Sequence, residues 1–142
     1  MSGENVEIVR RVIEGFQAGV ERSDFVNAPE NREFFADDYE WILEPGPVIA
    51  ERQVWRGVEG FLEFIRDWTE NFPDWSARVE RLIDAGDGRV VALTSQSATG
   101  KGSGVPVELN LGQVYELEEG RIVRIRNYQS HAEALEAAGL RE

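Results

Sequence analysis

The chain has 142 residues, of which 42% are hydrophobic and 30% are charged, and these values are typical of one globular domain. Its 27 acidic and 15 basic residues give a formal net charge of −12, which argues against a nucleic-acid partner because phosphate contacts need clustered Lys and Arg. The absence of cysteine excludes disulfides and thiolate metal sites, and the single histidine, His131, excludes a histidine metal cluster within one chain.

Targeting signals are also missing from the sequence. No apolar run approaches the roughly 18 residues of a membrane span, and the first residues lack the basic and then apolar pattern of a secretory signal. We therefore expect a cytoplasmic protein with no membrane partner and no metal or organic cofactor.

The first half of the chain predicts helices. Apolar residues at spacings of three and four predict a helix with the stripe Val6, Val9, Ile13, Phe16 and Val20. Residues 27–30, with Pro29 early, predict the start of a second, shorter helix. A third helix is predicted to begin at Gly57 and to end before Pro73.

Strands dominate the second half. Strands are predicted at residues 39–43, 75–83, 89–99, 105–117 and 121–128, and a short strand piece is predicted at residues 53–56. Glycine-containing turns separate the last four strands and indicate hairpins, so these strands are expected to form an antiparallel meander.

A final helix follows the last strand almost without a loop. Ser130 and Glu133 form the S-x-x-E capping box that marks a helix start. Gly139, with Leu140 folding back onto Leu135, predicts a Schellman ending.

Helices first and strands afterwards is the pattern of an α+β fold. We expect one domain, residues 1–142, in which a curved antiparallel sheet forms a cone with an open mouth and three to four helices cover its concave side. The strands at residues 89–99 and 105–117 carry apolar residues on both faces. One face then needs cover from outside the sheet, so we expect a homodimer that pairs sheet to sheet.

Four segments make the sequence similar to a known family. They are FADDYEW at residues 35–41, WRGVEG at 55–60, GKGSGVP at 100–106 and the C-terminal run at 120–140. Over nearly its whole length the chain resembles the SnoaL-like group of the nuclear transport factor 2-like superfamily, which also holds ketosteroid isomerases and limonene epoxide hydrolases. The resemblance implies the cone-shaped fold but no single reaction, because this fold hosts many chemistries and binding roles.

Glu44 is the first candidate catalytic residue. It precedes Pro45 at the end of the first long strand, where the resemblance to ketosteroid isomerases implies a general base. Here Glu replaces Asp, and one extra residue separates it from the Asp37–Asp38 pair. An apolar mouth would disfavour the charged form of this carboxylate and suit it to proton transfer. The alternative is a solvated glutamate at a strand end.

Other catalytic positions of the resembled enzymes are changed. Phe16 stands where isomerases place a donating tyrosine, and Gln113 stands where they place a protonated acid, so steroid isomerisation is not expected. Ser130 stands where SnoaL-type cyclases place a catalytic aspartate and keeps only the capping role. His131 is a second catalytic candidate because histidine readily exchanges protons near neutral pH, unless its ring simply faces water.

Four residues are candidates for ligand binding. Trp41 and Tyr128 alternate with polar neighbours on their strands, and Asn110 and Gln113 are polar residues in an otherwise apolar strand. An inward polar side chain needs a partner, which can be a ligand, water or another side chain. We expect these residues to line an apolar pocket with Glu44 near its mouth.

These observations favour a small-molecule enzyme of the isomerase, cyclase or hydratase type, which acts on a hydrophobic cyclic substrate by general acid/base catalysis without a cofactor. Two alternatives remain. One is a non-catalytic binder of a small hydrophobic ligand, and the other is a structural dimerisation module.

Overall fold

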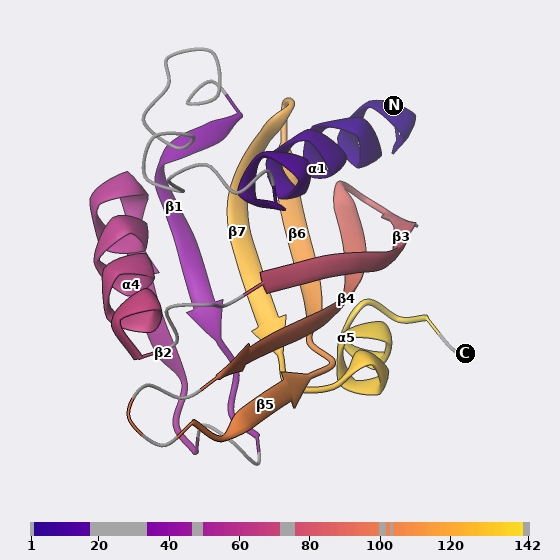
Figure 1. Cartoon of the computed structure of the whole chain (residues 1–142). Helices are drawn as coiled ribbons and strands as arrows, with labels where there is room; N and C mark the ends of the chain where they lie inside the picture. Colours follow the sequence, from indigo (N-terminus) through magenta and orange to yellow (C-terminus); the bar gives the residue numbers. More distant parts are fainter. Residues whose placement is uncertain are drawn as a thin grey trace.

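A computed structural model describes residues 2–17, 34–46, 50–71, 76–99, 102 and 104–140. Along the chain the elements are α1 (Ser2–Gln17), β1 (Phe35–Leu43), β2 (Gln53–Arg56), α4 (Gly57–Asn71), β3 (Ser76–Gly86), β4 (Arg89–Thr99), β5 (Pro106–Leu109), β6 (Gly112–Glu118), β7 (Arg121–Tyr128) and α5 (His131–Ala137) (Figure 1). The helix expected at residues 27–30 lies outside the described residues. No helix in the described part of the chain has the length and hydropathy of a membrane-crossing segment.

The strands form one seven-stranded sheet, which confirms the predicted α+β fold class. Its strand order is β2-β1-β7-β6-β4-β3, and β5 pairs with β4 beside this path. Strands β3, β4, β6 and β7 form the predicted antiparallel meander. The sheet as a whole is mixed because β1 pairs in parallel with β7. The sheet is open, and β2 and β3 end the path at opposite edges.

Two hairpin turns of the meander contain residues with the positive φ values that tight hairpins require. Asp87 and Gly88 have φ values of 55° and 77°, and Glu119 and Gly120 have values of 52° and 78°. Two consecutive left-handed residues are typical of the type I′ turn, whose twist matches that of the flanking strands.

The prediction of a single strand at residues 105–117 is wrong, because two strands occupy this segment. β5 ends at Leu109 and β6 begins at Gly112. Strand β4 passes the break without interruption, and the Thr94 N–H donates to the Leu111 carbonyl at 2.8 Å. A Cβ at Gly112 would collide with the side chain of Ala134 in α5. Glycine therefore allows α5 to pack directly on the start of β6.

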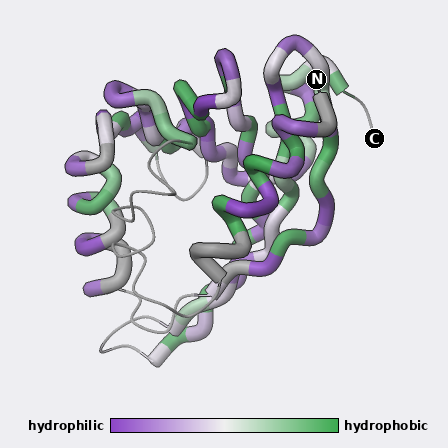
Figure 2. Tube along the Cα trace, turned by 90° about the horizontal axis from the view of Figure 1, so that it is seen from above, coloured by the Kyte–Doolittle hydropathy of each residue, from purple (hydrophilic) through white to green (hydrophobic). Residues whose placement is uncertain are grey.

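The sheet has two buried faces with separate cores. We call the face that packs against α1 and α4 the inner face, and the opposite face the outer face. Val90 belongs to the inner core together with α1 and α4 residues such as Val12 and Phe61. Val91, the next residue, belongs to the outer core with Leu135 of α5. In Figure 2 hydrophilic and hydrophobic residues alternate along helices and strands, as expected for elements with one buried side.

Helix α5 is built as the sequence predicts, but it lies on the outer face. The Ser130 hydroxyl accepts a hydrogen bond from the Glu133 N–H at 3.1 Å. Gly139 has a φ of 77°, and the Leu140 N–H donates to the Leu135 carbonyl at 2.8 Å. The expectation that all helices lie on the concave side is therefore wrong for α5, which covers apolar residues of β4 and β6 on the other side.

Candidate functional site

Two aromatic residues of β1 lie at the centre of the inner face. Tyr39 and Trp41 occupy alternate positions of the strand and are only 1% and 7% exposed. The Trp41 ring packs against Phe61 and Phe64 of α4, with centroid distances of 4.9 Å and 5.2 Å. Tyr39 packs against Phe35 at 4.8 Å. Tight aromatic packing of this kind holds both side chains in fixed positions.

Both residues carry a polar atom that lacks a partner. The Tyr39 hydroxyl and the Trp41 indole nitrogen are buried, and neither forms a hydrogen bond within the described structure. Such a buried, unpaired group costs about 1–3 kcal/mol. Burial, with a smaller effect of the Tyr115 hydroxyl, raises the pKa of Tyr39 far above its usual range. The hydroxyl therefore stays protonated at neutral pH and is available as a donor, as is the indole N–H.

A hydrogen-bonded network of side chains lies on the same face of β6 and β7. The Gln113 amide N–H donates to Asn127 Oδ1 at 2.8 Å, and the Tyr115 hydroxyl donates to Gln113 Oε1 at 2.9 Å. Asn127 in turn donates to the Ile42 carbonyl of β1 at 2.9 Å. Burial raises the pKa of Tyr115 well above its usual range, so this hydroxyl also stays a donor. Gln113 is thus on the inner face, as expected, and Asn127 is its partner.

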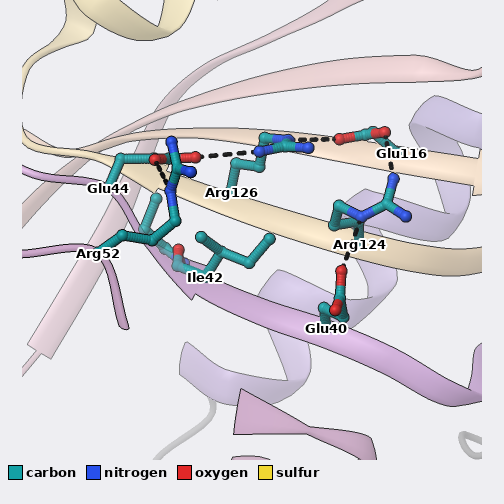
Figure 3. Close-up of polar contacts among 8 residues, drawn as sticks. Glu40, Ile42, Glu44, Arg52, Glu116, Arg124 and Arg126 are labelled. Carbon is teal, nitrogen blue, oxygen red and sulfur yellow. Dashed lines mark hydrogen bonds and ion pairs between the residues drawn. The ribbon is translucent and has the colours of Figure 1, made fainter. Parts of the chain in front are cut away.

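A ladder of alternating charges crosses the outer face (Figure 3). Its members in order are Arg56, Glu40, Arg124, Glu116, Arg126, Glu44 and Arg52, which we call the ion ladder. Its N–O distances lie between 2.7 and 3.1 Å. Hydrogen bonding to Glu40 is the main cause that raises the pKa of Arg124. Burial by itself would lower the pKa of Arg126. Hydrogen bonds to Glu116 and Glu44 outweigh this effect, so the pKa of Arg126 is raised.

Glu44 is the most buried acid of the ion ladder, at 4% exposure. Arg52 donates to its Oε1 at 2.7 Å and Arg126 donates to its Oε2 at 3.1 Å. The sequence predicted an apolar environment at the mouth of the cone, and this is wrong because two guanidinium groups surround the carboxylate. Successive side chains of a strand alternate between faces. Glu44 follows Trp41 by three residues and shares the outer face with Glu40 of the ion ladder.

Tyr128 also lies on the outer face. Ile125 pairs with Trp41 on the inner face, and Tyr128, three residues later, is half-buried against the outer core beside α5. Burial is the main cause that raises the pKa of Tyr128, and the nearby Glu44 carboxylate adds to it. Tyr128 therefore does not share a face with Trp41, and the expectation of one common pocket is wrong on this point.

Asn110 lies in the break between β5 and β6, and His131 lies close to Gly112 at the end of this break. Asn110 is exposed, because the alternation expected to turn it inward ends at the break. The His131 ring Nε2 lies 2.8 Å from the Thr94 carbonyl oxygen. The ring thus contacts a backbone group of β4 next to the break and ties α5 to that strand.

The structure therefore brings Trp41 and Gln113 to one face and Glu44 and Tyr128 to the other. The sequence analysis missed Tyr39, Tyr115 and Asn127 on the inner face. Tyr39 could have been found, because it lies two residues before Trp41 and period-two alternation gives both the same facing. In the described part of the chain, no three His, Cys, Asp or Glu side chains are grouped as a metal site would need.

The open sheet, its two inner-face helices and the polar groups between them define an α+β protein of the nuclear transport factor 2-like kind. The family model of the SnoaL-like domain matches residues 9–125, and the chain belongs to this family. A comparison with curated protein sequences gives no match.

Solved structures of similar fold agree with this assignment. A candidate SnoaL-like polyketide cyclase from Jannaschia sp. CCS1 is 22% identical with a TM-score of 0.70, over 88% of this chain and 84% of that one. A nuclear transport factor 2-like protein of unknown function from Burkholderia pseudomallei is 23% identical with a TM-score of 0.70, over 94% and 95%. TerC, crystallised with polyporic acid, is 15% identical with a TM-score of 0.69, over 96% and 98%. At these identities the likeness concerns the fold.

Proposed function

We propose that the protein binds a small, largely apolar organic molecule with at least one acceptor oxygen, and that Tyr39 and Trp41 donate hydrogen bonds to it. The observation that carries this proposal is the pair of buried donors without a partner on β1. Unpaired buried polar groups in native proteins call for an explanation, and a bound ligand supplies one. Membership of the SnoaL-like family and the fold shared with TerC, which was crystallised with polyporic acid, support a small-molecule role.

The surroundings of the two donors indicate the chemistry of the ligand. Phe61 and Phe64 flank Trp41, so the ligand is expected to present apolar or aromatic surface to them. The buried polar residues of the described inner face, such as Gln113 and Asn127, are uncharged. A carbonyl or quinone oxygen therefore suits the site better than a free carboxylate, which would be buried without a counter-charge.

A second candidate function is catalysis of the isomerase, cyclase or hydratase type. The same donor pair favours it, because donors that bind a carbonyl oxygen also stabilise the oxyanion that forms when a neighbouring proton is removed. Glu44 and His131 are the acid/base candidates from the sequence, but Glu44 lies on the outer face with Arg52 and Arg126, and His131 belongs to α5 on that face. A substrate held by the donor pair would therefore need another base. Glu44→Gln should leave its turnover unchanged, whereas a loss of at least about 100-fold would place the reaction on the outer face.

Binding can be tested with a panel of cyclic ketones, epoxides, quinones and polyketide-like compounds. Compounds that raise the melting temperature are then measured by calorimetry. Tyr39→Phe and Trp41→Phe should each weaken binding by about tenfold, the value of one hydrogen bond near 1.4 kcal/mol. Tyr128→Phe is the matched control, because Tyr128 lies on the outer face.

Two outcomes would contradict the proposal. One is a ligand whose affinity is unchanged in both Tyr39→Phe and Trp41→Phe. The other is a panel in which no compound binds, which would favour the dimerisation module. Mass spectrometry of each binding compound after incubation separates binding from catalysis.

A further inference from the structure

The hydrogen-bonded network of β6 and β7 runs in one fixed direction. It ends on the Ile42 carbonyl oxygen, which only accepts, so the Asn127 side chain must turn its NH2 group toward that oxygen, at 2.9 Å. Its Oδ1 then faces Gln113 and accepts from the Gln113 NH2 group at 2.8 Å. This leaves Gln113 Oε1, an amide oxygen that cannot donate, facing the Tyr115 hydroxyl at 2.9 Å. The proton of the Tyr115 hydroxyl is therefore committed to Gln113.

The Tyr115 hydroxyl consequently has only its lone pairs to offer to a further partner. In the part of the chain that the structure describes, its hydrogen bond to Gln113 is the only one that it makes. Trp41 is the opposite case, because an indole N–H donates and never accepts. The Tyr39 hydroxyl can do either. The inner face thus holds one unused group that only donates and one that can only accept.

These groups lie close together on the inner face. Trp41 pairs with Ile125 and Ile125 pairs with Tyr115, which puts Trp41 and Tyr115 in one row across β1, β7 and β6 (Figure 1). Two strand spacings separate their Cα atoms by about 10 Å, so one small molecule can reach both side chains. Burial is the main cause that raises the pKa of Tyr39, and the Tyr115 hydroxyl adds to it, although the Tyr39 hydroxyl has no hydrogen bond. The two hydroxyls are therefore near each other but too far apart to bond directly.

Building on the proposed function, we propose that the molecule bound at the inner face is a hydroxy-substituted cyclic ketone whose hydroxyl group donates a hydrogen bond to the Tyr115 oxygen. Its carbonyl oxygen accepts from Trp41, and its hydroxyl oxygen can accept from Tyr39 as well. A ligand with acceptors alone would leave the Tyr115 lone pairs unused. Gln113 is a positioning residue, because it holds the Tyr115 proton and so decides which ligand group Tyr115 can receive.

The probes are 1-tetralone, its 6-hydroxy and 7-hydroxy derivatives and the methyl ethers of both. Binding is measured by calorimetry at slightly acidic pH, where the phenols are neutral. At least one hydroxy derivative should bind about tenfold more tightly than 1-tetralone, as expected for one added hydrogen bond. The corresponding methyl ether should bind no better than 1-tetralone, because it brings an oxygen without a proton to Tyr115. This comparison needs no variant of the protein.

Gln113→Met tests the direction of the network. It releases the Tyr115 proton, so Tyr115 can donate, and the hydroxy derivative should lose most of its tenfold advantage over its methyl ether. Tyr115→Phe should also remove this preference. Trp41→Phe is the matched control, since it should weaken all five compounds alike and keep the preference for the hydroxyl group. The preference is a ratio measured within one variant, so a general loss of stability does not change it.

The inference is overturned if 1-tetralone and the methyl ethers bind as tightly as the hydroxy derivatives, which is also the result expected if a water molecule donates to Tyr115 instead. It is overturned too if the preference persists in both Gln113→Met and Tyr115→Phe, or if no hydroxy derivative binds while another compound of the panel does. In each of these cases binding is retained and the proposed function stands. Failure of the proposed function is a different result, in which no compound of this series or of the panel binds, and the inference then fails with it.

Discussion

Tyr39 and Trp41 combine burial with unused hydrogen-bonding capacity, and this combination separates them from the other core aromatic residues. Tyr115 is equally buried, but its hydroxyl donates to Gln113 at 2.9 Å. The two tyrosines therefore form a natural comparison, because each loses the same atom when it is replaced by phenylalanine. Only in Tyr115 does that atom have a partner in the described structure.

Tyr39→Phe is expected to leave the free energy of unfolding of the ligand-free protein unchanged or to raise it by up to about 1 kcal/mol, because it removes an unpaired buried hydroxyl. Tyr115→Phe should lower the free energy of unfolding by about 1–3 kcal/mol, because Gln113 Oε1 then lacks its donor. Urea unfolding monitored by circular dichroism measures both. A loss above about 1 kcal/mol in Tyr39→Phe would mean that its hydroxyl has a partner.

Ser130 provides a second test at a single side chain. Its hydroxyl caps α5 by accepting from the Glu133 N–H at 3.1 Å. Ser130→Ala should lower the free energy of unfolding by about 1 kcal/mol, while Ser130→Asp should stay close to the parent because aspartate is also a good cap. Thermal and urea unfolding of both variants check this. Strong destabilisation by Ser130→Asp would contradict the capping role.

Elements with strong local signals could be predicted from the sequence. β2, β4 and β7 occupy the expected residues 53–56, 89–99 and 121–128, because each is bounded by a glycine or charged turn next to a run of β-forming residues. α5 begins after its predicted cap and ends at the predicted glycine. In each of these elements, the residues that predict the start or the end of the element lie within a few positions of it.

Features that depend on distant contacts could not be predicted in this way. The break between β5 and β6 lies where α5 packs on Gly112. This contact joins two separate segments of the chain, and neither segment contains a local sequence pattern that predicts it. The facing of Glu44 and Tyr128 depends on the parallel register of β1 and β7, which joins the first and last strands of the chain. A shift of one residue reverses every facing in a strand, so alternation alone could not assign these candidate site residues.

The ion ladder makes a prediction for the sheet formed by β1, β6 and β7. A hydrogen bond from Arg124 is the main cause that lowers the pKa of Glu40 below its ordinary value of 4.5. At acidic pH the unfolded chain therefore takes up a proton at Glu40 before the folded chain does. The stabilisation is complete above about pH 4.5 and is lost as the pH falls through the lowered pKa.

Glu40→Gln should consequently be less stable than the parent at neutral pH and should approach the parent stability as the pH falls well below 4.5, the ordinary value for Glu40. Urea unfolding at a series of pH values measures the difference. Glu118→Gln, at an exposed position, is a control with the same chemical change and no part in the ion ladder. A parent-to-Glu40→Gln difference that stays constant from neutral to acidic pH would contradict this account of Glu40.

The whole molecule has an outer face divided into two parts. α5 covers one part, where Val91, Leu93 and Val114 are buried within the chain itself. The ion ladder occupies the other part, on β1, β6 and β7. The apolar residues that suggested a homodimer in the sequence thus receive cover from α5. We still propose a homodimer through the outer face, in which the open part of the sheet is the contact surface.

The charges make the salt dependence of this dimer predictable. Each acid of the ion ladder already has an arginine partner in its own chain, so a second copy gains few new ion pairs. The main salt-dependent contribution is then repulsion between two chains of net charge −12. Added salt screens this repulsion and should strengthen the dimer.

Sedimentation equilibrium at micromolar concentration should therefore give twice the chain mass of 16.0 kDa, with a dissociation constant that falls as the salt concentration rises from about 0.01 to 0.15 M. A single 16.0 kDa species at every salt concentration would contradict the homodimer. A dimer that weakens with added salt would instead mean that ion pairs form between the subunits, with the ladder arginines exchanging their partners across the interface.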